Sequence, residues 1–277
     1  MKRKCMILAL CLILAACSSQ PGSNSSAGVT TVSGGGAGEA AESAGETETS
    51  KTVDPSQIPS ASADIFAMDT YMTVTCYGKR AEEAVAAAQA EIERLDDLLS
   101  IGKADSEISR INRDGSGVMS EDTSTMVTEA LRLYDTTGGA FDITVYPLMD
   151  LWGFTTGNFA VPDAQELSAL LAQCGSDKLT VNGDTIMLAE GQGIDLGGIA
   201  KGYTSGHLME IFEEYDLAGA VVSLGGNVQT VGSKPDGTAW QVGIADPKDP
   251  SSAIAVVRFT GSKALVTSGD YQRYFEQ

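Results

Sequence analysis

The sequence is poor in basic residues, with 18 Lys and Arg against 37 Asp and Glu among 277 residues and a formal net charge of -19. Proteins that bind nucleic acids need clustered Lys and Arg to contact the phosphates, so this composition excludes nucleic acid as the expected partner. An anionic small ligand is compatible with the charge, but its site would need a local cation.

Histidine and cysteine are also scarce. His207 is the only histidine, and no group of Cys and His residues has the spacing of a zinc site. No nucleophile stands beside a base, which excludes the common triad arrangements as an expectation. Of the five cysteines, only Cys76 and Cys174 fall in the expected globular part. Core packing explains both, and a single disulfide between them stays open.

The N-terminus has the features of an export signal. A Lys-Arg-Lys sequence at 2–4 precedes an apolar run over residues 6–16, which is too short to span a bilayer. The run ends in Leu-Ala-Ala before Cys17, which resembles the lipobox of bacterial lipoproteins. We therefore expect residues 1–16 to be a lipoprotein signal peptide and Cys17 to carry lipid chains, palmitate among them. An ordinary signal peptide with an incidental Cys17 is the alternative.

Lipidation of Cys17 would anchor the protein to the extracytoplasmic face of the cell membrane without spanning the bilayer. Residues 17–62 are rich in Gly, Ser, Ala, Thr and Glu, a composition that cannot form a core and that predicts a flexible tether. A coil of this length has a root-mean-square reach of about 36 Å. We expect the globular domain over residues 63–277.

Hydrophobic spacing in this domain predicts helices and strands in a mixed order. Helices are expected from Ala81, after Ser120, after Asp163 and around Leu208. The third should end at Gly175, with Leu167, Leu170, Leu171 and Cys174 on its apolar face. The expected strands are 71–77, 179–181, 185–188, 220–224, 240–245, 254–259 and 264–267. Asn182-Gly183 predicts a hairpin, and Gly261-Ser262 is expected to pair the last two strands. Because strands and helices do not alternate strictly, the predicted fold class is α+β, with a mixed sheet and packed helices.

The segment Ile194–Tyr203 is the most informative part of the sequence. It places Asp195, two Gly and Lys201 at the end of an apolar run and immediately before a helix. Gly lets the backbone approach a ligand closely, and a helix N-terminus offers N–H groups to an anion. This arrangement suits a phosphate-bearing ligand, although a structural turn with a solvated Lys201 explains it equally well. The spacing matches neither the dinucleotide-binding Gly motif nor a P-loop.

Three further segments carry weaker signals. Gly138–Phe154 places Asp142 beside Phe141 in a loop with Gly and Pro, which suits a flat ring ligand, but a helix stop followed by a core strand explains it better. Ser223–Asn227 and Thr267–Tyr271 are strand ends that run into small and polar residues, where ligand loops often lie. None of these segments supports an assignment by itself.

Together and in this order, the segments resemble the ApbE family, the FAD:protein FMN transferases. The resemblance covers the chain from about Ala63 to its last residue. The matching motifs are Ala67-Met68-x-Thr70, Asp105–Asn112, Phe141–Val145 with Trp152-Gly153-Phe154, Ile194–Tyr203, Ser223–Asn227 and Thr267–Tyr271. Six motifs in family order are far more specific than any one of them.

The resemblance implies an exported, often lipidated enzyme that cleaves FAD with Mg²⁺, transfers FMN through a phosphoester to a Thr of a partner protein, and releases AMP. The partner is typically a subunit of a membrane redox complex. Such phosphoryl transfer depends on positioning and charge neutralisation, which the metal and Lys201 would supply in an acidic protein. The resemblance makes the Gly198 carbonyl a metal ligand. The residues that it places at the FAD site are Met68, Gly102, Ala140, Phe141, Asp142, Asp195 and Lys201.

The sequence departs from the family pattern at several positions. Asp69 replaces the usual Gly of Met-Gly-Thr, Gly102 stands where many members place a Tyr or Asn against the flavin, and Gly206 stands where the family has Asp. Members also continue into a His-Ile-x-Asp-Pro-x-Thr-Gly segment. We therefore expect the sequence to be C-terminally incomplete, with the remaining metal ligands and the catalytic groups beyond Gln277.

Two other functions stay open at this point. A Mg²⁺-dependent FAD pyrophosphatase would release free FMN and AMP because water replaces the acceptor Thr, and the loss of stacking at Gly102 is compatible with it. A non-catalytic lipoprotein that stores or delivers flavin would bind FAD without turnover.

Overall fold

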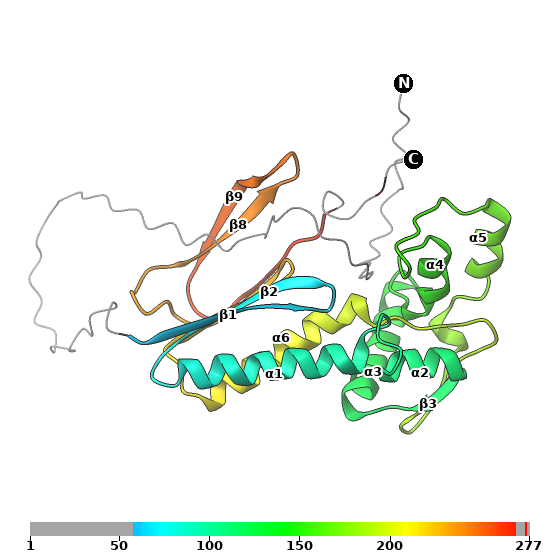
Figure 1. Ribbon diagram of the computed structural model, residues 1–277, viewed down its shortest axis with the longest axis horizontal. Coiled ribbons are helices and arrows are strands. Elements are labelled where there is room, and N and C mark those ends of the chain that lie inside the picture. The colour runs from blue at the N-terminus through cyan, green and yellow to red at the C-terminus, as the bar shows by residue number, and fades with distance from the viewer. Residues whose placement is uncertain (1–57, 270–274, 276–277) are drawn as a thin grey trace, which may run out of the picture.

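The computed structural model describes residues 58–269 and Phe275 (Figure 1). The expected signal peptide, Cys17, most of the expected tether, and Asp270 and Tyr271 of the last motif lie outside the described residues. Among the described residues, no helix is long and apolar enough to cross a membrane.

A five-stranded antiparallel sheet is the largest layer, with the strand order β1-β2-β6-β7-β10. Its strands are β1 (Ser60–Ala67), β2 (Thr70–Tyr77), β6 (Gly219–Leu224), β7 (Asn227–Gly232) and β10 (Ala264–Val266). Side chains alternate along each strand, so Met72, Val74 and Cys76 of β2 point together to the buried face. The sheet therefore has one apolar face, which other elements must bury.

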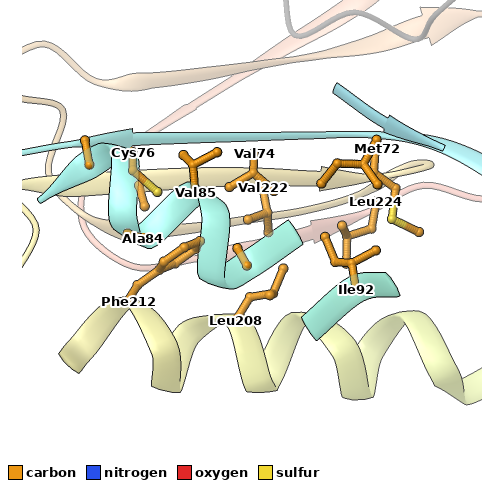
Figure 2. Close-up of a cluster of buried hydrophobic side chains, with 14 of the residues drawn as sticks. Met72, Val74, Cys76, Ala84, Val85, Ile92, Leu208, Phe212, Val222 and Leu224 are labelled. Carbon is orange, nitrogen blue, oxygen red and sulfur yellow. The ribbon is translucent and has the colours of Figure 1, made fainter. Parts of the chain in front are cut away.

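Two long helices, α1 (Ala81–Leu99) and α6 (Gly197–Glu214), cover that face of the sheet and run along it (Figure 1). Figure 2 shows their apolar side chains meeting those of the strands. Ile92 of α1 and Leu208 and Phe212 of α6 have no exposed surface. Burial of this apolar area is the main stabilising contribution in this half of the molecule.

A second core lies where the end of α1 meets α2 (Glu107–Asp114), α3 (Glu121–Thr137) and the first turns of α6. Leu95, Ile108, Met126 and Ile194 are fully buried in it. Ile186 adds to this core from a small sheet with the strand order β3-β5-β4. The strands of that sheet are β3 (Ser116–Val118), β4 (Thr180–Asn182) and β5 (Thr185–Met187).

The remaining elements are short helices and a two-stranded ribbon. They are the 3₁₀ helices η2 (Ile143–Val145) and η3 (Ser176–Lys178), the helices α4 (Tyr146–Leu151) and α5 (Ala164–Leu171), and the ribbon of β8 (Trp240–Asp246) and β9 (Asp249–Phe259). Beside α4, four rings form an aromatic cluster in which Phe159 stacks on Phe275 with centroids 5.4 Å apart; Trp152 and Phe154 complete it.

The predicted α+β class is confirmed, and most of the expected elements are present. The helices expected from Ala81, after Ser120 and around Leu208 are α1, α3 and α6, and the expected hairpin is β4–β5, which turns at Gly183 with φ 61°. The Ser120 hydroxyl caps α3 by accepting from the Thr123 N–H at 3.3 Å.

Two expectations about these elements are wrong. β9 pairs with β8, whereas the strand after Gly261-Ser262 is β10 and pairs with β7. The helix after Asp163 ends at Leu171, and none of its residues is buried, because α5 packs chiefly on the short helix α4.

Cys76 and Cys174 are both free thiols, so the disulfide left open above is not formed. Cys76 lies in the core under the sheet, where burial raises its pKa to about 12. Cys174 follows α5 and is partly buried, which also raises its pKa. Core packing therefore accounts for Cys76, and a raised pKa makes both thiols poor nucleophiles at neutral pH.

Candidate functional site

The segment Ile194–Tyr203 forms the entry and the first two turns of α6. The helix begins at Gly197, so Gly198 and Lys201 lie inside it, whereas the sequence pattern placed them before it. A Cβ atom at Gly198 would lie 3.2 Å from Cε2 of Phe141. Glycine at this position therefore lets the Phe141 ring lie directly against the start of the helix.

Several N–H groups at the start of α6 already have acceptors. The Gly197 N–H donates to Oδ1 of Asp195 at 2.7 Å, and two further N–H groups of the first turn donate to the Leu196 carbonyl at 2.9 Å. These bonds already engage the Gly197 and Ile199 N–H groups of the first turn. An anion here would be held mainly by the charge of Lys201 and less by the helix amides than the sequence predicted.

Asp195 is the buried carboxylate of this region, with 9% of its surface exposed. Its N–H donates to the carbonyl of Ile143 at 2.8 Å. Burial raises the pKa of Asp195 to about 6, although the bond from Gly197 and the charge of Lys201 both act to lower it. A buried carboxylate that keeps a cation nearby and has a displaced pKa is typical of functional sites.

The loop after α3 supplies Phe141 and Asp142, and it continues into η2 instead of the core strand that was the simpler expectation. Oδ1 of Asp142 accepts three hydrogen bonds, from the N–H and the hydroxyl of Thr144 at 2.9 and 2.7 Å and from the hydroxyl of Ser176 at 2.7 Å. This oxygen therefore holds the loop together. Ala140 is exposed, and Phe141 is the residue that the loop packs against the second core.

Two other motifs meet α6 at one end of the large sheet. The β6–β7 turn, Gly225-Gly226, has φ angles of 59° and 94°, which favour glycine. Asn227 follows it, and its Nδ2 donates to the Lys201 carbonyl at 3.2 Å. The Thr267 N–H donates to the carbonyl of Gly226 at 3.0 Å. The described parts of Ser223–Asn227 and Thr267–Tyr271 thus lie beside the turn of α6 that carries Lys201.

Met68 and Asp69 form the β1–β2 turn, with φ angles of 47° and 53°. Asp tolerates this left-handed conformation better than most residues, so the departure from Gly at Asp69 is compatible with the turn. The Met68 N–H donates to Oδ1 of Asp96 at 2.8 Å, and the Thr204 hydroxyl lies 3.7 Å from the Met68 sulfur. Met68 therefore packs beside α6, against both cores.

Asp96 connects Met68 to the loop that contains Gly102. The Lys103 ammonium forms ion pairs with Asp96 and with Asp97, the latter at 2.6 Å, and Gly102 is exposed in this loop. Asp96 is a residue that sequence reasoning missed, since one acidic residue among several on α1 gave no signal.

The sequence-predicted site residues fall into two groups. Five of them gather around the start of α6: Met68, Phe141, Asp195, Gly198 and Lys201. Gly102 and Ala140 are exposed in loops that lead to this group, and Asp142 faces Ser176 through its Oδ1.

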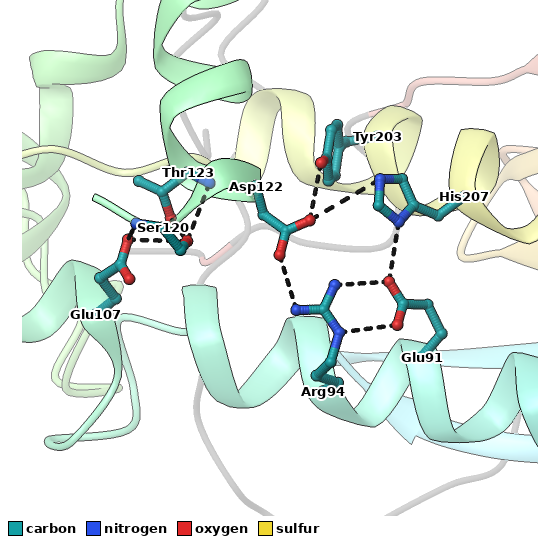
Figure 3. A network of polar contacts seen from close by, with 8 residues as sticks. All are labelled: Glu91, Arg94, Glu107, Ser120, Asp122, Thr123, Tyr203 and His207. Carbon is teal, nitrogen blue, oxygen red and sulfur yellow. Dashed lines mark hydrogen bonds and ion pairs between the residues drawn. The ribbon is translucent and has the colours of Figure 1, made fainter. Parts of the chain in front are cut away.

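A polar network at Tyr203 and His207 holds α6 to α1 and α3 (Figure 3). Arg94 pairs with Glu91 and with Asp122, both at 2.7 Å, which holds the pKa of each carboxyl below its usual range. Asp122 also accepts from the Tyr203 hydroxyl at 2.8 Å, and Nδ1 of His207 lies 3.0 Å from Glu91. Tyr203 and His207 are thus engaged in packing between helices.

The described residues offer few ligands for a metal ion. No group of three or more His, Cys, Asp or Glu side chains within residues 58–269 is arranged to hold one. The Gly198 carbonyl and the Asp195 carboxylate are two oxygen donors at the start of α6, and Mg²⁺ prefers an octahedral set of oxygens that water and substrate phosphates usually complete. A magnesium ion here would therefore need further oxygen ligands beyond these two.

The family model of the ApbE family matches residues 68–277. The FAD:protein FMN transferase of Vibrio cholerae serotype O1 is 36% identical over 201 residues, which is 68% of this chain and 60% of that protein. The FAD:protein FMN transferase of Escherichia coli K12 is 32% identical over 208 residues, 72% of this chain and 59% of that protein. The chain thus spans about three fifths of the length of these relatives.

Solved structures agree with the sequence comparison. The ApbE protein of Thermotoga maritima superposes with a TM-score of 0.72 at 30% identity, over 78% of this chain and 72% of that one. The flavin transferase ApbE of Vibrio cholerae gives a TM-score of 0.68 at 28% identity, over 79% of this chain and 74% of that one. The similarity therefore extends through the fold that positions the site.

Proposed function

Because the chain belongs to the ApbE family, we propose that it acts in flavin transfer: it binds FAD, attaches the FMN moiety to a threonine of a partner protein, and releases AMP. The similarity to proteins named FAD:protein FMN transferase supports this activity. In the reaction the threonine oxygen forms a bond to the FMN phosphorus while the bond to the AMP oxygen breaks. The hydroxyl proton is lost to a base.

The observation that carries the proposal is the arrangement at the start of α6. Lys201 supplies a cation for the pyrophosphate in an otherwise acidic chain. The ring of Phe141 lies against Gly198 and offers a flat apolar surface, and Met68 supplies a polarisable contact from the neighbouring turn. Asp195 is an acceptor for hydrogen-bond donors of the nucleotide.

The loops next to this group would complete the FAD site. We propose that Gly102, Ala140 and Asp142 line it from the side of the second core, with Asp142 shaping its loop through Thr144 and Ser176. None of the described residues is assigned a catalytic role.

Mg²⁺ belongs to the proposal as the ion that would offset the charge of the pyrophosphate. The Gly198 carbonyl would be one ligand. Since the described residues do not provide a complete ligand set, no step of the reaction is derived through the ion.

The location and the acceptor are part of the same proposal. A lipid on Cys17 would hold the domain at the extracytoplasmic face of the cell membrane, and the intervening segment would let it reach an acceptor threonine in a subunit of a membrane redox complex. Replacement of Cys17 by Ser should release the protein from the membrane fraction, and unchanged membrane association would contradict the anchor.

The activity is tested by incubating the protein with FAD, Mg²⁺ and a partner that carries the acceptor threonine. The expected result is a partner whose mass rises by one FMN moiety, together with one equivalent of AMP. Release of free FMN and AMP without a partner would instead show a pyrophosphatase. FAD binding with neither product would show a flavin-binding protein, and no interaction with FAD would overturn the proposal.

A further inference from the structure

Asn112 forms two hydrogen bonds that join segments far apart in the sequence. Its Nδ2 donates to the carbonyl of Ile194 at 2.8 Å, and its Oδ1 accepts from the N–H of Ile194 at 2.7 Å. One side-chain amide thus satisfies both backbone groups of one residue, as a neighbouring strand would. Both bonds are partly buried, which makes their loss costly.

The residue held in this way leads directly into the site. Asp195 follows Ile194, and its own N–H is bound from the other side by the carbonyl of Ile143 at 2.8 Å. The carboxylate of Asp195 then accepts from Gly197 at the start of α6. The short stretch before α6 is therefore fixed between α2 on one side and η2 on the other.

The same short helix, α2, contacts two more parts of the second core. The Ser109 hydroxyl donates to the carbonyl of Ile101 at 3.2 Å, directly before Gly102. Oε1 of Glu107 accepts from the N–H of Ser120 at 2.9 Å, so it supports the residue that caps α3 (Figure 3). One face of α2 thus sets the Gly102 loop, and its last turn sets the entry to α6.

We propose that Asn112 is a positioning residue for the flavin site: through the backbone of Ile194 it holds Asp195 and the start of α6 in register with Phe141 and with the Gly102 loop. The inference rests on the proposed function. It explains why the Asp105–Asn112 motif accompanies the others, although its residues lie outside the group around Lys201. Asn112 acts through Ile194 and is assigned no contact with the substrate.

Three substitutions separate positioning from stability. Asn112→Ala removes both bonds, whereas Asn112→Asp keeps the acceptor for the Ile194 N–H and places an oxygen against the Ile194 carbonyl. Asn112→Gln keeps both groups on a longer side chain and is the conservative variant. The matched control is Ile111→Val, because Ile111 is the neighbouring buried residue and its truncation lowers stability without removing a hydrogen bond.

The readouts are amide exchange at Ile194, the FAD dissociation constant from flavin fluorescence, and the unfolding midpoint. Asn112→Ala should raise the exchange rate of the Ile194 amide about tenfold and should weaken FAD binding about tenfold. The reason is that the N–H and the carbonyl of Ile194 each lose one shielded hydrogen bond. Asn112→Gln should recover part of the affinity. Ile111→Val should keep FAD affinity within about twofold of the unsubstituted protein at a comparable loss of stability.

FAD affinity that is unchanged in both Asn112→Ala and Asn112→Asp would overturn the inference. It would also be overturned if Ile111→Val lost as much affinity as Asn112→Ala at the same unfolding midpoint, since the effect would then be general destabilisation. If Asn112→Ala does not fold, the Asp and Gln variants decide the question. Failure of the unsubstituted protein to bind FAD would instead contradict the proposed function, so the two outcomes are distinguishable.

Discussion

The two halves of helix α6 are built differently. The second half packs Leu208 and Phe212 into the core under the large sheet, and neither has exposed surface. The first half has two glycines in its first turn, a lysine one turn later, and Asp195 buried just before it. Glycines lower the helix propensity of this half, and a buried carboxylate also opposes stability.

One half of α6 thus provides stability, and the other half carries the proposed ligand-binding residues. The second half anchors the helix to strands and to α1, which lets the first half carry residues that a purely structural helix would not favour. Unfavourable residues kept at a site with a buried charge are typical of function. Substitutions in the second half should therefore affect unfolding, and those in the first half should affect flavin binding.

The largest expected effect is on stability in the second half. Phe212→Ala should lower the free energy of unfolding by about 3–5 kcal/mol, because it removes a fully buried ring and leaves a cavity. Urea unfolding measures the change, and Phe212→Leu is the milder control. A loss below about 1 kcal/mol would show that the second half does not anchor the helix.

Asp195→Asn should change how stability depends on pH. The folded carboxyl has a pKa of about 6, above its ordinary value near 4, so the folded state binds more protons between these values and stability falls as pH rises through this window. The Asn variant can still accept from Gly197 and should be more stable above pH 6, by up to about 3 kcal/mol.

The difference in free energy of unfolding between the Asn variant and the unsubstituted protein reports on Asp195 alone, because the other carboxyls are the same in both. Unfolding curves at pH 4, 5, 6 and 7 should show a difference that grows with pH, while flavin transfer by the variant falls. A difference that is constant across these pH values would contradict the buried, charged state of Asp195.

Lys201→Ala should weaken FAD binding by about 10- to 100-fold, since a bond to a charged group is lost. Its effect on the free energy of unfolding should stay below about 1 kcal/mol, as expected for a partly exposed side chain. Lys79→Ala makes the same change of charge at an exposed position before α1 and serves as the control. FAD affinity is measured by flavin fluorescence, and equal affinities of the two variants would contradict the assignment of Lys201 to the FAD site.

The smallest effect comes from two glycines of the same helix. Gly206→Ala meets nothing within 4 Å and should stabilise the protein by about 1 kcal/mol through helix propensity. Gly198→Ala lies in the first turn and places a methyl group 3.2 Å from Phe141, so the ring must shift and FAD binding should weaken. Thermal unfolding and FAD titration of both variants test the contrast, and equal FAD affinity would contradict it.

Local patterns were sufficient for much of the fold. The apolar spacing of α1 predicts the residues that are buried, among them Val85, Ala88 and Ile92. Ser120 is the N-cap of α3 and Gly138 is its C-cap, as their chemistry predicts. These elements are determined by nearby residues. The partner of β10 depends on which edge of the sheet is free, and this is a long-range property that the Gly261-Ser262 turn signal could not indicate.

The candidate site could also be predicted only where its signals are local. Gly198 and Lys201 stand out in the sequence, and the structure places Gly198 against Phe141 at the start of the helix that carries Lys201. The roles of Asp96 and Asn112 depend on hydrogen bonds to Met68 and Ile194, 28 and 82 residues away. A polar residue on a helix surface gives no sign of such a distant partner.

The difference between the halves of α6 is tested most directly by amide exchange along this helix with and without FAD. Residues 194–203 should exchange more slowly when FAD is bound, and residues 208–214 should keep the same rates. Equal protection of both halves, or protection confined to the second half, would contradict the assignment of flavin binding to the start of α6.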